Sequence, residues 1–213
     1  MKQNLSTART AQGFTLSEVM IAVAIFSVVI AISSSFFVDS YKTLYKSQTA
    51  LEANRSSRSF LDFLSQDGME ADSFVVYPSY SDKNQKKNRV ASGQSGDFLV
   101  LAETEIGTLE TEYLRLIGYY ATKRTTDEYF DILVFEYEVP EANKTKSLES
   151  LVSEAVNKAT DRVVFAQIKR IGEEGMFINV DSGNVFSFHG IRVRFPEQAQ
   201  PSKILHTTIN VRS

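Results

Sequence analysis

One acidic residue, Glu18, stands at the beginning of a long uncharged stretch of the sequence. The twenty residues that follow it, 19–38, carry no charge. A helix of about 20 residues crosses the ~30 Å of hydrocarbon in a bilayer. A carboxylate costs about 2.5–3.5 kcal/mol at the centre of such a helix and less toward its end. Glu18 therefore either marks the water edge of a membrane span or is a functional carboxylate that needs a cationic partner.

The thirteen residues that open the chain are polar and basic. Met1–Gly13 contains Lys2 and Arg9 and no acid. A basic start followed by an apolar run is the general plan of a secretory signal, and basic residues keep their side of a span in the cytoplasm. However, the apolar run is long enough to cross a membrane, and no A-x-A-like cleavage site follows it. The segment thus predicts a membrane span with a cytoplasmic N-terminus.

Gly13, Phe14 and Glu18, in that register, resemble the N-terminal signature of type IV prepilins and type II secretion pseudopilins. That family has a short basic leader ending in Gly, then Phe, then Glu as the fifth mature residue, then an apolar helix. The resemblance implies that a prepilin peptidase cleaves between Gly13 and Phe14 and N-methylates Phe14. Loss of Lys2 and Arg9 with the leader changes the formal net charge from -3 to -5.

The resemblance also gives Glu18 a partner. Cleavage exposes the cationic amine of Phe14 in a medium of low dielectric constant, where an unpaired charge is costly. Glu18 of a neighbouring subunit, shifted along the helix axis, can pair with that amine. The pair would set the register in which a subunit joins a filament.

A long helix is predicted after the signature, because no Gly or Pro occurs between Gly13 and Gly68. At 1.5 Å per residue it is roughly 80 Å long. Its first half is apolar all round, and Gly68 is expected to stop it. Its second half is amphipathic, with an apolar stripe that can pack on a domain: Tyr41, Leu44, Leu51, Phe60, Leu61 and Leu64.

The rest of the chain is expected to form one globular head with a mainly antiparallel sheet. Alternating apolar and polar residues predict eight strands, and 147–159 reads as a short helix with Leu148, Leu151, Val152 and Ala155 on one face. Residues 82–96 read as a mobile basic loop. The predicted strands are 73–77, 97–103, 112–121, 130–139, 162–168, 176–180, 185–195 and 204–212.

These elements give an α+β, pilin-like fold in which the sheet packs on the second half of the long helix. The expected divisions are a cleaved leader at 1–13, a transmembrane and assembly helix at 14–38, its amphipathic continuation at 39–67 and the head at 68–213. Residues 55–71 further resemble the helix end of J-type minor pseudopilins and W-type minor pilins. The residues that carry this second resemblance are Arg58, Phe60, Phe63, Asp67 and Ala71.

The sequence offers little for catalysis. It has no Cys and only two His, His189 and His206, whose spacing excludes an HExxH motif and which are interpreted as strand residues. Asp181 and Asn184 are candidates for calcium, although the hairpin turn predicted at 181–184 uses the same residues. No other cofactor is expected. Clustered acids, interpreted as solvated strand faces, are Glu103, Glu105, Glu110, Glu112, Glu136, Glu138, Glu173 and Glu174.

The sequence therefore predicts a non-enzymatic minor pilin or pseudopilin subunit in or at the tip of a type II secretion pseudopilus or type IV pilus. Its expected partners are the prepilin peptidase, other minor and major pilins or pseudopilins, and inner-membrane lipid. The net charge of -3 favours no nucleic-acid partner. The N-terminus is expected in the cytoplasm and the head in the periplasm or outside the cell. The alternative is an extracytoplasmic binding or enzymatic domain on an uncleaved signal anchor.

Overall fold

The computed structural model describes residues 13–82, 88–106, 111–123, 129–181, 184–192 and 203–212. The chain divides into two units, Met1–Glu52 and Ala53–Ser213. Most of the predicted leader, residues 1–12, lies outside the described residues.

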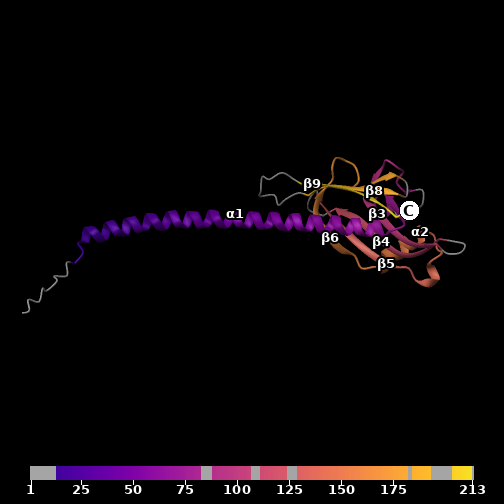
Figure 1. Ribbon diagram of the computed structural model, residues 1–213, viewed down its shortest axis with the longest axis horizontal. Helices are drawn as coiled ribbons and strands as arrows, with labels where there is room; N and C mark the ends of the chain where they lie inside the picture. The colour runs from indigo at the N-terminus through magenta and orange to yellow at the C-terminus, as the bar shows by residue number, and fades with distance from the viewer. Residues whose placement is uncertain are drawn as a thin grey trace, which may run out of the picture. The chain divides into compact units, whose positions relative to one another are not determined.

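The long helix is α1, Leu16–Glu70, with 55 residues (Figure 1). The expected stop at Gly68 is wrong, because the helix continues to Glu70 and the Ala71 N–H still bonds the Asp67 carbonyl at 3.0 Å. Gly68 instead permits close packing. A Cβ at this position would lie 2.6 Å from Cγ2 of Ile209 and 3.1 Å from the ring of Phe186.

The head contains an antiparallel sheet of nine strands among the described residues, so the predicted α+β arrangement is confirmed. The sheet order is β1-β3-β4-β5-β6-β8-β7-β2, and β9 pairs with β8. The strands are β1 Ser73–Tyr77, β2 Ser95–Gly96, β3 Phe98–Ile106, β4 Thr111–Lys123, β5 Phe130–Glu138, β6 Arg162–Lys169, β7 Phe177–Asp181, β8 Val185–Arg192 and β9 Lys203–Asn210.

All eight predicted strands have a counterpart within three residues at each described end, and residues 193–195 of the seventh lie outside the described residues. One strand, β2, was not predicted. It falls in the expected basic loop, of which 83–87 lie outside the described residues. The rest of that segment is not simply loop, because Ser95–Gly96 pairs with Phe177 and Ile178 of β7.

β1 and β2, the first and last strands in the sheet order, are linked by backbone hydrogen bonds. These bonds run from residues before and after β2 to β1 and to the residue that follows it. The Val90 N–H bonds the Val76 carbonyl at 2.8 Å, and the Asp97 N–H bonds the Pro78 carbonyl at 3.0 Å. The sheet therefore curls back toward its own first strand. Sequence patterning left the strand order open, since this closure depends on contacts between distant segments.

The curled sheet encloses the last turns of α1. Phe60 stacks on Phe165 of β6 at 4.9 Å between ring centroids and meets Phe188 of β8 edge-on at 5.1 Å. β8 and β9 lie on one side of this part of the helix and β4, β5 and β6 on the other (Figure 1). Of the predicted apolar stripe, Phe60, Leu61 and Leu64 pack in this core. Its remaining members, Tyr41, Leu44 and Leu51, belong to the first unit.

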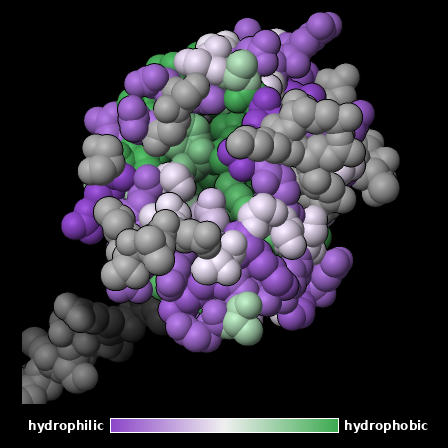
Figure 2. Space-filling model, turned by 90° about the vertical axis from the view of Figure 1, so that its right-hand side faces the viewer, coloured by the Kyte–Doolittle hydropathy of each residue, from purple (hydrophilic) through white to green (hydrophobic). Residues whose placement is uncertain are grey.

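A second core lies between the sheet and α2, Leu148–Lys158. The predicted helix face is confirmed, because Leu148, Leu151, Val152 and Ala155 are all buried. Figure 2 shows one face of the head, where hydrophilic residues cover most of the surface and apolar residues gather in a central hollow.

The α2 helix is tied to the sheet through the carboxylate of Glu154. This group accepts hydrogen bonds from Nζ of Lys158 at 2.6 Å, from the Tyr137 hydroxyl at 3.0 Å and from Nδ2 of Asn143 at 3.0 Å. The bonds from Lys158 and then Tyr137 lower the pKa of Glu154 from 4.5 to about 2. The folded state therefore favours the charged carboxylate.

We predict that Glu154→Gln lowers the melting temperature at pH 7 and that this difference shrinks in acid. A lowered pKa stabilises the folded chain above pH 4.5, and the contribution is lost as the pH falls from 4.5 toward 2. Thermal unfolding followed by circular dichroism from pH 7 to pH 3 measures the effect. Glu141→Gln is the matched control, since Glu141 is 85% exposed in its pair with Lys144 and exposed pairs contribute little. Equal shifts in both variants would contradict the prediction.

Candidate functional site

The peptide bond between Gly13 and Phe14 precedes the first helical residue, Leu16. Phe14 is 86% exposed, and, apart from the chain neighbours of Gly13, no heavy atom of the described residues lies within 4 Å of the position that a Cβ on Gly13 would take. An enzyme can reach this bond without unwinding the helix. The absence of a side chain at residue 13 leaves the approach to the carbonyl open.

The helix begins with a reciprocal cap between Thr15 and Glu18. The Thr15 N–H donates to Oε2 of Glu18 at 2.8 Å, and the Thr15 hydroxyl donates to the same oxygen at 2.8 Å. In return the Glu18 N–H lies 3.4 Å from the Thr15 hydroxyl oxygen. This is the capping-box arrangement, which satisfies helix N–H groups that have no carbonyl partner.

Both bonds from Thr15 fall on one oxygen of the Glu18 carboxylate. The other oxygen, Oε1, has no hydrogen-bond partner among the described residues. The side chain is exposed, so Oε1 is accessible to a donor from outside the chain. A negative charge is also favoured here, because the N-terminus of a helix carries partial positive charge.

The residues after Glu18 make α1 long and apolar enough to span a membrane, by length and composition alone. The large apolar side chains of this stretch, including Ile21, Ile25 and Phe26, are exposed. Lipid or the helices of other subunits are the surroundings that would cover such a surface.

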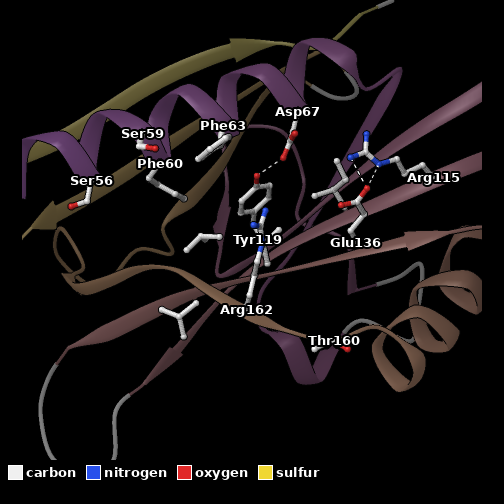
Figure 3. A pocket seen from close by; sticks show the side chains of 14 residues that line it. Ser56, Ser59, Phe60, Phe63, Asp67, Arg115, Tyr119, Glu136, Thr160 and Arg162 are labelled. Atoms are coloured by element: carbon white, nitrogen blue, oxygen red, sulfur yellow. Dashed lines mark hydrogen bonds and ion pairs between the residues drawn. The ribbon is translucent and has the colours of Figure 1, made fainter.

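A groove of about 570 Å³ opens in the head between α1 and strands β4, β5 and β6 (Figure 3). The Tyr119 hydroxyl donates a short hydrogen bond to Asp67. Burial raises the pKa of Asp67, and the bond from Tyr119 opposes that rise. Phe63, which also lines the groove, is 55% exposed.

These contacts explain the residues of the second resemblance. Phe60 and Ala71 are buried in the core, and Asp67 holds Tyr119, so three of the five residues fix the end of α1 in the sheet. Arg58 is exposed. The pattern therefore has a packing role in this chain, and the J- or W-type assignment stays a prediction.

Two of the clustered acids, Glu103 and Glu136, flank Arg115. Its Nη1 lies 2.8 Å from Glu103, and its Nε lies 2.7 Å from Glu136. Glu70, at the end of α1, is 3.9 Å from the same guanidinium. These carboxylates are thus partners of an arginine. The structure does not describe Glu110.

Asp181 and Asn184 lie at the two ends of the turn between β7 and β8. The Asn184 N–H bonds the Asp181 carbonyl at 3.0 Å, as a hairpin requires, while residues 182–183 lie outside the described residues. Among the residues that the structure places, no group of three or more His, Cys, Asp or Glu is arranged to hold a metal ion. Calcium at Asp181 and Asn184 stays a prediction.

The two histidines, distant in sequence, are neighbours in the sheet. His189 of β8 faces His206 of β9, with ring centroids 4.2 Å apart. Their interpretation as strand residues is confirmed. Their contact depends on the register of β8 and β9, which the spacing in sequence does not reveal.

Thr15 is the site residue that sequence reasoning missed. The segment Thr15-Leu16-Ser17-Glu18 has the form [ST]-x-x-E before an apolar run, which is the sequence signature of a capping box. That signal is local, whereas the partner expected above for Glu18 lies on another subunit. Glu18 has an internal partner as well.

Comparison with known families gives one match. The model of the prokaryotic N-terminal methylation motif matches residues 8–34, a span that contains Gly13, Phe14 and Glu18. No curated protein and no solved structure matches the chain. The match covers the signature and the first turns of α1, and none of the head.

We predict that Thr15→Val loosens the first turn of α1. Valine keeps the shape of threonine but loses the hydroxyl that bonds Glu18, and removing a capping side chain costs about 0.5–2 kcal/mol. Hydrogen exchange of the amides of residues 16–19, measured on the full chain in detergent micelles, should become faster. Thr15→Ser is the control, because serine keeps the hydroxyl and the N–H that bond Glu18. Unchanged exchange in Thr15→Val would contradict a working cap.

Proposed function

We propose that this chain, whose N-terminal methylation motif supports the type IV pilin and pseudopilin family, is a minor subunit of a type II secretion pseudopilus or a type IV pilus. The motif indicates a substrate of the prepilin peptidase. The family is a structural one, so the chemistry at Gly13 and Phe14 is done to this chain by another protein. The observation that carries the proposal is the exposed Gly13–Phe14 bond followed by Glu18 at the start of an apolar helix.

Assembly is proposed to use the free oxygen of Glu18. Cleavage after Gly13 leaves Thr15 in the mature chain, so the cap can persist. Oε1 of Glu18 then remains available to the Phe14 amine of a neighbouring subunit. In a low-dielectric environment such a pair relieves two charges that are each costly alone. This geometry supports a role for Glu18 in the register of assembly.

A minor role is proposed from the uninterrupted helix and the head. Major pilins commonly have Gly and Pro just past the conserved acid, whereas this chain has neither between residues 14 and 67. It also lacks the Cys pair of many major pilins. The resemblance of residues 55–71 to J-type pseudopilins and W-type pilins points in the same direction. The expected partners are therefore other minor and major subunits.

The apolar helix and the motif indicate a protein anchored in a membrane by its N-terminal segment. We propose the orientation with the N-terminus in the cytoplasm and the head outside the inner membrane, because Lys2 and Arg9 precede the span. The rival function is an enzyme or binding domain on an uncleaved anchor. It gives Glu18 no role in assembly.

We predict that Glu18→Gln reduces incorporation into filaments without affecting cleavage. The glutamine carbonyl can still accept the bonds from Thr15, so the variant removes the charge and keeps the cap. The measurement is the fraction of chain in the sheared filament preparation relative to the membrane, in the native cell. Thr15→Val is the matched control, because it weakens the cap and keeps the charge.

The assembly role of Glu18 and the anchored-domain alternative predict different results in this experiment. Assembly through Glu18 requires Glu18→Gln to be cleaved normally and to accumulate in the membrane, with Thr15→Val incorporated normally. Normal incorporation of both variants would remove the assembly role of Glu18. Failure of the wild-type chain to be cleaved would support the anchored-domain alternative.

A further inference from the structure

The only two histidines of the chain form a cross-strand pair in the head. β8 and β9 are antiparallel, and His189 lies directly opposite His206. Their ring centroids are 4.2 Å apart, with the ring planes inclined at 55°. Seventeen residues separate them in sequence, so only the pairing of these two strands brings the rings together.

The hydrogen-bond pattern of the two strands places this pair at close range. The Val211 N–H bonds the Asn184 carbonyl at 2.8 Å, and bonded and non-bonded pairs alternate along antiparallel strands. Asn184 and Val211 therefore form a hydrogen-bonded pair. His189 lies an odd number of positions from Asn184 along the unbroken register, so His189 and His206 form a non-hydrogen-bonded pair. Side chains approach each other most closely in pairs of this type.

Among the described residues, one imidazole nitrogen of the pair lacks the hydrogen-bond partner that buried polar groups normally have. Nε2 of His189 is buried and has no hydrogen-bond partner in the part of the chain that the structure describes. Such a group is unusual in a folded protein and calls for an explanation. His206 is exposed, so its ring can turn about its side-chain bonds and the pair can be reached from solvent.

The surroundings of His189 favour its neutral form. Burial lowers the pKa of His189, the neighbouring His206 lowers it further, and Glu174 opposes the shift. Neutral imidazole is the form that binds metal ions, and it is the nitrogen ligand that suits Zn²⁺, Ni²⁺ and Cu²⁺. The nearby carboxylate of Glu174 adds negative charge, which favours a cation.

We propose that His189 and His206 together bind one divalent transition-metal ion, of the Zn²⁺, Ni²⁺ or Cu²⁺ class. No third protein ligand completes the site among the described residues, so water or a group from outside the chain would fill the remaining positions. The site is therefore open, and it is weaker than a closed site with four protein ligands. The proposal is independent of the function assigned to the N-terminal segment.

The test is a metal titration of the full chain, purified in detergent without a polyhistidine tag. Isothermal titration calorimetry with ZnCl₂ and with NiCl₂ should show one saturable site, and MgCl₂ should show none. Binding should weaken as the pH falls below about 6, because protonated imidazole cannot bind a metal.

The key variant is His206→Ala, since His206 is exposed and its loss leaves the core unchanged. Loss of an outer-shell partner already costs about 10–100-fold in metal affinity, so loss of one of two ligands should cost at least as much. Thr208→Ala, at the next exposed position of β9, is the matched control and should bind as the wild type does. His189→Gln, checked for folding by circular dichroism, should lose binding as well.

Two results would overturn the proposal. One is the absence of saturable Zn²⁺ and Ni²⁺ binding to the wild-type chain at pH 7.5. The other is binding that survives unchanged in His206→Ala, which would place the metal elsewhere on the protein.

Discussion

The charge of Glu18 at the start of an apolar helix is the constraint on which the proposed function depends. A carboxylate beside hydrocarbon is costly unless donors or a cation surround it. The chain meets part of this requirement itself, through two bonds from Thr15 to Oε2. Oε1 is left accessible, and a neighbouring subunit can supply the cation. The Glu18 side chain can thus cap the first turn of α1 and bind a cationic partner at the same time.

At its other end the same helix is held by packing. Phe60 and Leu64 are buried in the core, where Phe60 contacts aromatic rings of β4, β6 and β8, and Gly68 allows β9 to approach closely. Asp67 bonds Tyr119 in the groove beside this contact. The helix and the curled sheet therefore share one core.

The N-terminal signature and most strands could be predicted because their signals are local. Cleavage residue, acid and apolar run follow one another in sequence, and alternation marks strands such as 73–77 within a few residues. Features made by distant contacts could not be predicted. Gly68 resembles a helix stop until Ile209 is placed against it, the two-residue strand β2 is too short to alternate, and His189 meets His206 only through strand register.

The central claim, that a peptidase cleaves this chain after Gly13, is tested most directly by mass spectrometry of its N-terminus. The protein should be isolated from membranes of its native cell, and its N-terminal peptide sequenced by fragmentation. The account predicts a chain that begins at Phe14 with an N-methyl group on its amine. An intact Met1, or an N-terminus at any other residue, would contradict it.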